Sequence, residues 1–233
     1  MIKQYRWCLW MAAALLVLGW GMGGCGAKTK PIGDDALEMI QLPAPQTTGG
    51  KPLMDALRDR SSSRNFSPEP LPQQVLSNML WAAFGINRPN SGKRTAPSAL
   101  NWQETDIFVF TSQGVFLYEP TENILLPVAA GDHRGVTGSV IQPFVKKAPV
   151  NLVYVVDAAR IGIIGSAIGT DVRDMFSATA VGFIGQNVYL YCASEGLATV
   201  VRGSLDRDAL ANLLKLRPEQ RVILAQSVGY PVD

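Results

Sequence analysis

The longest helical pattern in the chain covers residues 171–194 and constrains the fold more than any other feature. A single helix of that length needs other elements along most of one side to bury its apolar residues. Small residues are spread along it: Ala178, Ala180, Gly182 and Gly185. Because small side chains let neighbouring elements approach closely, we expect this helix to be the buried spine of the domain.

Apolar runs before and after this helix predict strands. The turn Ser112-Gln113-Gly114 separates two of them and predicts a hairpin. Residues 150–156 are almost continuously apolar, which is typical of a central strand. The strands predicted overall are 107–111, 115–119, 150–156, 197–202 and 221–228.

Shorter helices complete the pattern. We predict them at residues 52–60, at 72–84 with Gly85 ending the helix, and at 205–216 with Ser204 as N-cap. Residues 86–104 form a long polar loop, and such loops are often functional. The fold class predicted is therefore α+β, a mostly antiparallel sheet flanked by helices.

The N-terminal 24 residues are typical of an export signal. Lys3 and Arg6 form a short positive region, and the apolar stretch 9–20 is short for a membrane span. The sequence Met22-Gly23-Gly24-Cys25 resembles a bacterial lipobox, which predicts a lipoprotein lipidated at Cys25 and held on the membrane of the cell envelope. Ordinary cleavage and a retained membrane anchor are the alternatives.

Residues 25–50 are rich in Gly, Pro and Thr and predict a flexible tether, so we expect the folded domain at residues 51–233. A chain of 233 residues with 47% hydrophobic residues suits one globular domain. The chain has 21 basic and 19 acidic residues, and the two basic residues of the signal account for the difference. This balance disfavours a nucleic-acid partner.

Side chains suited to catalysis are scarce. His133 is the single histidine, so a metal site or a Ser–His–Asp triad is disfavoured, and the nucleophile elbow Gly-x-Ser-x-Gly is absent. Neither a dinucleotide fingerprint nor a Walker loop occurs. Beyond the signal and Cys25, Cys192 is the remaining cysteine, which excludes an intrachain disulfide. It is either a buried hydrophobe or a reactive thiol. Chemistry would therefore belong to a cofactor.

The run Arg60-Ser61-Ser62-Ser63-Arg64-Asn65-Phe66 offers such a group a binding site. Guanidinium forks match phosphate oxygens, and the serine hydroxyls between them fill the remaining acceptor positions. The run therefore predicts a phosphate clamp, and a solvated loop is the alternative.

Three further segments stand beside this run: Ala96-Pro97-Ser98-Ala99-Leu100-Asn101-Trp102-Gln103, Gly185-Gln186-Asn187-Val188-Tyr189-Leu190 and Ser194-Glu195-Gly196-Leu197-Ala198-Thr199. Together with Arg60-Ser61-Ser62-Ser63-Arg64-Asn65-Phe66, they resemble the FMN-dependent nitroreductase superfamily, and the resemblance covers residues 53–231. Gly131-Asp132-x-Arg134 and Gln142-Pro143-Phe144-Val145 are similar to the SagB/thiazole-oxidase branch, flavoenzymes that oxidise azolines.

The resemblance implies a nitroreductase-like fold and a homodimer with FMN at the interface. Arg60 and Arg64 would neutralise the phosphate, and Asn101 would bind the flavin edge or the ribityl chain. Backbone N–H groups at Glu195 and Gly196 would lie near flavin N5 and O4 and stabilise the reduced ring. The FMN-binding residues implied are Arg60, Ser61, Ser62, Arg64, Pro97, Ser98, Asn101, Glu195 and Gly196. For the basic residue that the family has near its C-terminus, Arg202 and Arg217 are the candidates.

The function implied is ping-pong hydride transfer through flavin N5 between a small-molecule electron donor and an acceptor. Export argues against NAD(P)H as donor, so an azoline or another reduced substrate is an alternative. A non-catalytic flavin-binding or interaction lipoprotein of the same fold, or an unrelated structural lipoprotein, is the rival. Three individual roles stay open: Trp102 is loop filler or a lid, Gln186 and Asn187 are flavin ligands or packing residues, and Arg134 is functional or only paired locally.

Overall fold

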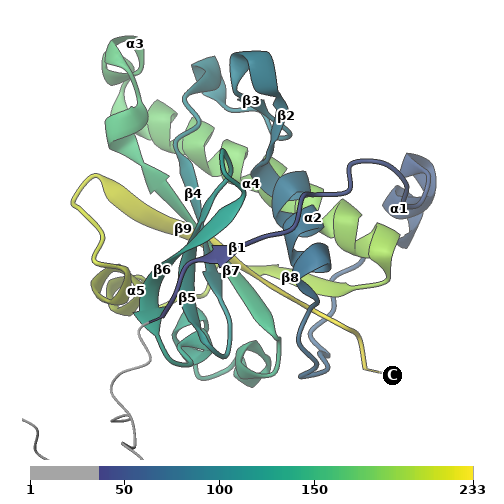
Figure 1. Cartoon of the computed structure of the whole chain (residues 1–233). Helices are drawn as coiled ribbons and strands as arrows, with labels where there is room; N and C mark the ends of the chain where they lie inside the picture. Colours follow the sequence, from purple (N-terminus) through teal and green to yellow (C-terminus); the bar gives the residue numbers. More distant parts are fainter. Residues whose placement is uncertain (1–36, 233) are drawn as a thin grey trace, which may run out of the picture. The chain divides into compact units, whose positions relative to one another are not determined.

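A seven-stranded sheet with the strand order β1-β6-β5-β4-β7-β9-β8 forms the centre of the fold, and every neighbouring pair is antiparallel (Figure 1). The computed structural model describes residues 37–232, apart from the side chains at positions 164 and 166. The strands are β1 Ile40–Gln41, β4 Thr105–Phe110, β5 Gly114–Glu119, β6 Ile124–Ala130, β7 Val150–Asp157, β8 Ala198–Arg202 and β9 Gln220–Gly229, and a separate hairpin joins β2 Ile86–Arg88 to β3 Lys93–Arg94.

Helices pack on both faces of this sheet, which confirms the predicted α+β class. The α-helices are α1 Leu53–Asp59, α2 Gln73–Phe84, α3 Ile163–Ser166, α4 Thr170–Glu195 and α5 Arg207–Leu214. Short 3-10 turns are η1 Pro89–Ser91, η2 Ala99–Asn101, η3 Arg134–Thr137, η4 Pro143–Lys146 and η5 Ala158–Arg160. The helices therefore divide the core into one cluster on each side of the sheet.

Side-chain alternation along β4 shows how the sheet separates the two clusters. Ile107 and Val109 join the core formed with α2 and α4, whereas Phe108 and Phe110 join the core formed with α5. Every residue of β7 is buried, because both faces of this strand are covered. Its continuous apolar run therefore marks an interior strand, as predicted.

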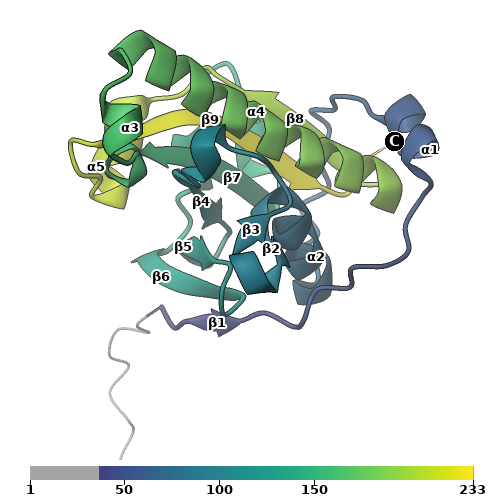
Figure 2. The same ribbon diagram turned by 90° about the horizontal axis from the view of Figure 1, so that it is seen from above.

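Helix α4 is the predicted spine, and Figure 2 shows it running along the sheet above β9. Gly185 lies on its buried side, where a Cβ would meet Val201 at 3.4 Å and where the carbonyl accepts from Gln226 Nε2 at 3.3 Å. Ala178 and Gly182 instead face outward. The small residues thus serve close packing on one side only, and the opposite side also carries exposed apolar residues: Val172, Met175 and Phe183.

The expected tether is partly folded, so the boundary predicted at residue 51 is wrong. Strand β1 pairs with β6, and Leu42 is only 3% exposed because it joins the core beside α2. The Pro43 carbonyl accepts from the Ser77 hydroxyl at 2.6 Å. Residues 37–50 therefore belong to the domain.

Two other local predictions need correction. Strand β6 was missed, because Pro127 interrupts its apolar run; the proline sits beside a register shift opposite Phe116. Helix α5 begins at Arg207, and the Asp206 carboxylate rather than Ser204 accepts from the Ala209 N–H at 2.9 Å. The signal segment and Cys25 lie outside the described residues. Within residues 37–232, no helix is long and apolar enough to span a membrane.

Candidate functional site

Arg60 ends α1 and begins the predicted phosphate clamp. Its backbone N–H donates to the Ala56 carbonyl, and the chain then continues extended. The guanidinium lies over the ring of Tyr189 in α4, 5.4 Å from the ring centre. Arg64 is exposed. Within the described part of the chain, neither arginine forms an ion pair with a carboxylate, so both keep their charge available to an anion.

The acidic residue nearest in sequence, Asp59, is already neutralised. Lys51 Nζ lies 2.9 Å and Arg58 Nε 3.4 Å from its carboxylate oxygens. The hydrogen bond from Lys51 is the main cause that lowers the pKa of this exposed carboxyl group. Asp59 therefore competes little for the guanidinium of Arg60.

The serines of the clamp are tied to elements far away in the sequence. Ser62 Oγ lies 2.8 Å from Tyr189 Oη, and the Ser63 N–H donates to the Thr199 carbonyl of β8 at 2.9 Å. Ser61 is exposed. The arginine–serine run is thus held against α4 and the edge of β8, and is more ordered than a solvated loop would be.

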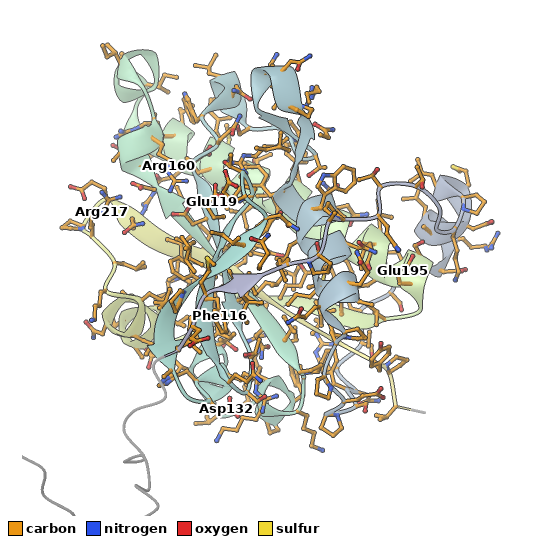
Figure 3. All side chains as sticks on the ribbon, viewed as in Figure 1. Phe116, Glu119, Asp132, Arg160, Glu195 and Arg217 are labelled. Atoms are coloured by element: carbon orange, nitrogen blue, oxygen red, sulfur yellow. The ribbon has the colours of Figure 1, made fainter. Side chains whose placement is uncertain are left out.

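The Glu195–Gly196 turn lies at the same end of α4, and Figure 3 shows Glu195 beside α1. Gly196 has a φ of 70°, the left-handed region that favours glycine. Its N–H, which we expected near a flavin, instead donates to the Cys192 carbonyl and ends the helix. A Cβ on Gly196 would meet nothing within 4 Å, so open space borders the turn.

The loop that carries Pro97, Ser98 and Asn101 is organised by Gln103. The Gln103 N–H donates to Ser98 Oγ at 3.0 Å, and its side-chain oxygen accepts from Arg94 Nε at 2.6 Å. Its side-chain nitrogen donates to the Gly92 carbonyl at 3.1 Å and to Asn101 Oδ1 at 3.2 Å.

This loop is strained where it presents Asn101. Leu100, Asn101 and Gln103 have φ values of 48°, 57° and 50°. Pro97 and Asn101 are exposed, and within residues 37–232 the Asn101 side-chain amide donates to no acceptor. The strained loop therefore offers a free hydrogen-bond donor.

The clamp and the Asn101 loop lie at opposite ends of α4. Trp102 packs edge-on against Phe176, with 6.2 Å between ring centres, whereas the clamp packs on Tyr189. Because an α-helix rises about 1.5 Å per residue, Phe176 and Tyr189 are roughly 20 Å apart along it. Figure 3 agrees: Arg160, which donates to the Gln103 carbonyl, lies far from Glu195. One chain therefore does not bring the two groups of predicted site residues together.

Several open alternatives resolve to structural roles. The Asn187 amide donates to the Ala82 carbonyl at 3.0 Å, and Arg134 pairs locally with Asp132 at 2.7 Å. His133 is half-buried, and its Nε2 lies 2.8 Å from the Ala130 carbonyl oxygen. Cys192 is buried, which raises the pKa of its thiol. No cluster of His, Cys, Asp and Glu that could hold a metal occurs in the part of the chain that the structure describes.

Neither candidate for the additional basic residue reaches the clamp. Arg202 is only 4% exposed and donates to Asn151 Oδ1 at 3.0 Å and to the Thr137 carbonyl, and burial lowers its pKa to about 10. Arg217 pairs with Asp157. The positive charge of the clamp therefore comes from Arg60 and Arg64.

Comparison with known proteins agrees with this fold. A model of the nitroreductase family matches residues 57–230. A protein of Methanocaldococcus jannaschii assigned as nitroreductase MJ1384 is 28% identical over 189 residues, 78% of this chain and 92% of its own length. The chain belongs to the nitroreductase family and is a nitroreductase-like oxidoreductase.

Solved structures show the same fold. One from Ralstonia eutropha, described as a nitroreductase, shares 40% identity with a TM-score of 0.78, covering 86% of this chain and 92% of its own. The NADPH:FMN oxidoreductase from Vibrio harveyi shares 19% identity with a TM-score of 0.58, covering 78% of this chain and 69% of its own. At that identity the likeness shows the fold alone.

Proposed function

We propose that this protein is an FMN-dependent oxidoreductase whose phosphate site is the clamp of Arg60, Ser62 and Arg64. The observation that carries the proposal is a pair of guanidinium groups that, within residues 37–232, form no ion pair with a carboxylate. Between them lie Ser62, whose hydroxyl is bonded to Tyr189 of α4, and Ser63, whose backbone N–H donates to the Thr199 carbonyl of β8. A dianionic phosphate ester fits such a donor set.

The surroundings also suit the rest of the cofactor. Open space beside Gly196 would admit a flavin ring next to the end of α4. The side-chain nitrogen of Asn101, which donates to no acceptor within residues 37–232, would bind the flavin edge or the ribityl hydroxyls. When bound, FMN would supply the redox chemistry, accepting hydride at N5 from a donor and passing it to a second substrate by a ping-pong mechanism.

We propose a homodimer, because the clamp and the Asn101 loop are too far apart to meet in one chain. The apolar residues exposed on α4, with Met175 56% exposed, offer a surface that a second copy would cover. In a two-fold arrangement each site would then take its clamp from one chain and its loop from the other.

A non-catalytic flavin-binding lipoprotein is the second candidate, and one observation favours it. The Gly196 N–H is already bonded within the helix end, so it would not donate fully to a reduced flavin. The protein would then bind FMN without efficient turnover.

The test is flavin binding followed by reduction. We expect the purified full-length protein to become yellow with FMN and to be reduced anaerobically by one of NADH, NADPH or an azoline-containing peptide. Bound FMN that none of these reduces would favour the binding protein, and absence of flavin binding would refute both candidates.

The electron donor and the location are further proposals. Oxidation of azolines rests on Gly131-Asp132-x-Arg134 and residues 142–145, and reduction by the azoline peptide alone would support that branch. We also propose that the protein is exported and anchored through lipid on Cys25. Cys25→Ala should then release it from the membrane fraction, and unchanged membrane association would contradict the lipid anchor.

A further inference from the structure

We propose that Tyr189 is a positioning residue that prepares both Arg60 and Ser62 to bind a phosphate. Tyr189 comes from α4, far from the arginine–serine run in the sequence, and is half-buried between that run and β8. The role rests on the proposed FMN function, because it concerns the phosphate end of the same site.

Tyr189 Oη takes part in two hydrogen bonds, one with β8 and one with the clamp. A backbone N–H can only donate, so the Val201 N–H donates to Tyr189 Oη, with 2.9 Å between the atoms. Tyr189 Oη and Ser62 Oγ share the second hydrogen bond, 2.8 Å long, in which either atom could be the donor. The proposed role requires the phenol to donate. Ser62 then accepts from Tyr189, and the serine's own hydrogen stays free for a phosphate oxygen.

This arrangement turns Ser62 into a donor directed at an anion. A serine hydroxyl in solution donates or accepts equally well, whereas a hydroxyl that already accepts from a phenol is a stronger donor. Phosphate oxygens at neutral pH are acceptors. The chain of Val201 N–H, Tyr189 and Ser62 therefore selects an acceptor-rich ligand group.

The ring of Tyr189 also restrains Arg60. The guanidinium lies 5.4 Å from the ring centre, within the range of a cation–π interaction. Arginine loses considerable side-chain entropy when it is held in one position. Because the ring already restricts Arg60, less of this entropy is lost when phosphate binds.

If Tyr189 has this role, loss of its hydroxyl should weaken the binding of ligands that carry the phosphate group and of no others. Tyr189→Phe keeps the ring over which Arg60 lies and removes only the hydroxyl. We expect affinity for FMN to fall about tenfold, as for loss of one hydrogen bond to a charged group. Affinity for riboflavin, which has the same ring and ribityl chain without the phosphate, should stay unchanged.

Three other variants sharpen the test. Ser62→Ala should weaken FMN binding to a similar extent, and because Ser62 is exposed it should fold normally. The double variant should lose little more than either single variant, since both act through one chain of hydrogen bonds. Tyr191→Phe is the matched control: two positions along α4, its hydroxyl donates to the Val75 carbonyl at 3.2 Å instead. It should leave FMN affinity unchanged.

The outcomes separate the role from the function. Wild-type protein that binds neither flavin refutes the FMN function and this role with it. If wild-type protein binds FMN and Tyr189→Phe binds it equally well, only the role of Tyr189 is overturned. Equal losses for FMN and riboflavin would overturn it too, because a purely structural defect would not distinguish the phosphate.

Discussion

The clamp and the Asn101 loop differ in how their geometry is maintained. The clamp depends on contacts with distant parts of the chain, namely Tyr189 of α4 and Thr199 of β8. The loop depends mainly on hydrogen bonds of Gln103 with near neighbours such as Ser98 and Gly92. The Asn101 loop can therefore contact another chain and keep its conformation. The geometry of the clamp, in contrast, depends on the packing of α4 against β8.

The largest effect should come from removing the charge of the clamp. Arg60→Ala combined with Arg64→Ala should weaken FMN binding at least about 100-fold, since each guanidinium would contribute hydrogen bonds to a charged group. Binding of riboflavin should change far less. Quenching of flavin fluorescence during titration measures both affinities.

Arg221→Ala is a suitable control for this double variant. Arg221 is exposed and pairs with Asp174 in the amino-terminal half of α4, away from the clamp. It should leave FMN affinity unchanged although it removes one exposed positive charge, half of what the double variant removes. Equal losses in the double variant and the control would show that overall charge, rather than the clamp, governs binding.

If each site takes its clamp from one chain and its loop from the other, mixing a clamp variant with a loop variant should restore FMN binding at some sites. A clamp variant (Arg60→Ala, Arg64→Ala) mixed with a loop variant (Asn101→Ala) should form mixed dimers in which one site has an intact clamp and an intact loop. Roughly a quarter of all sites should then bind FMN normally, provided that the chains exchange at random in a two-fold dimer. If each site were built within one chain, mixing would restore none, and binding would remain that of the separate variants.

The fold was largely predictable because its elements are local patterns with strong periodicity. The interior strand β7 and the helix α4 appear directly in the sequence. Strand β6 does not, because Pro127 lacks the N–H group that a regular strand uses for pairing. The strand accommodates this proline at a register shift opposite Phe116. Strand β1 is too short to show a period, and its pairing with β6 is a long-range contact that composition does not report.

For the candidate site, the sequence indicates residue types but not the contacts between them. Arginine and serine chemistry predicts the clamp residues, resemblance to the family predicts the loop, and both assignments stay predictions. Tyr189 and Arg94 were not assigned to the site, because a tyrosine in a helix and an arginine in a polar loop have many ordinary roles. Their importance follows from contacts with Ser62 and with Gln103, which only the fold brings about.

Loss of the residue that organises the loop should have a moderate effect. Gln103→Ala would leave Arg94 Nε without its acceptor and the Gly92 carbonyl without its donor. We expect it to destabilise folding by about 2 kcal/mol, the cost of leaving such groups unpaired. Urea denaturation measures the change, with Gln113→Ala at an exposed hairpin turn as control. A loss no larger than that of the control would mean that the loop does not depend on Gln103.

The smallest effects should appear in the pH dependence of stability, where the two regions should respond in opposite directions. The hydrogen bond from Lys51 lowers the pKa of Asp59 beside the clamp, so its stabilising effect is present above the unfolded pKa of about 3.9 and is lost as pH falls through the folded value. Asp106 pairs with Arg160 beside the loop, and burial raises the pKa of its carboxyl group. The folded state therefore favours the protonated form of Asp106. The stability that this protonation contributes is fully present below the unfolded pKa and is lost as pH rises through the folded pKa.

Melting temperatures of wild type, Asp59→Asn and Asp106→Asn between pH 3 and 7 test this contrast. As pH rises, wild type should gain stability relative to Asp59→Asn and lose it relative to Asp106→Asn. The first difference should be slight, because an exposed ion pair contributes little. Differences that change in the same direction would show that Arg160 stabilises the Asp106 carboxylate more than burial disfavours it. The folded state would then favour the ionised carboxylate at both ends of α4, at Asp106 as at Asp59.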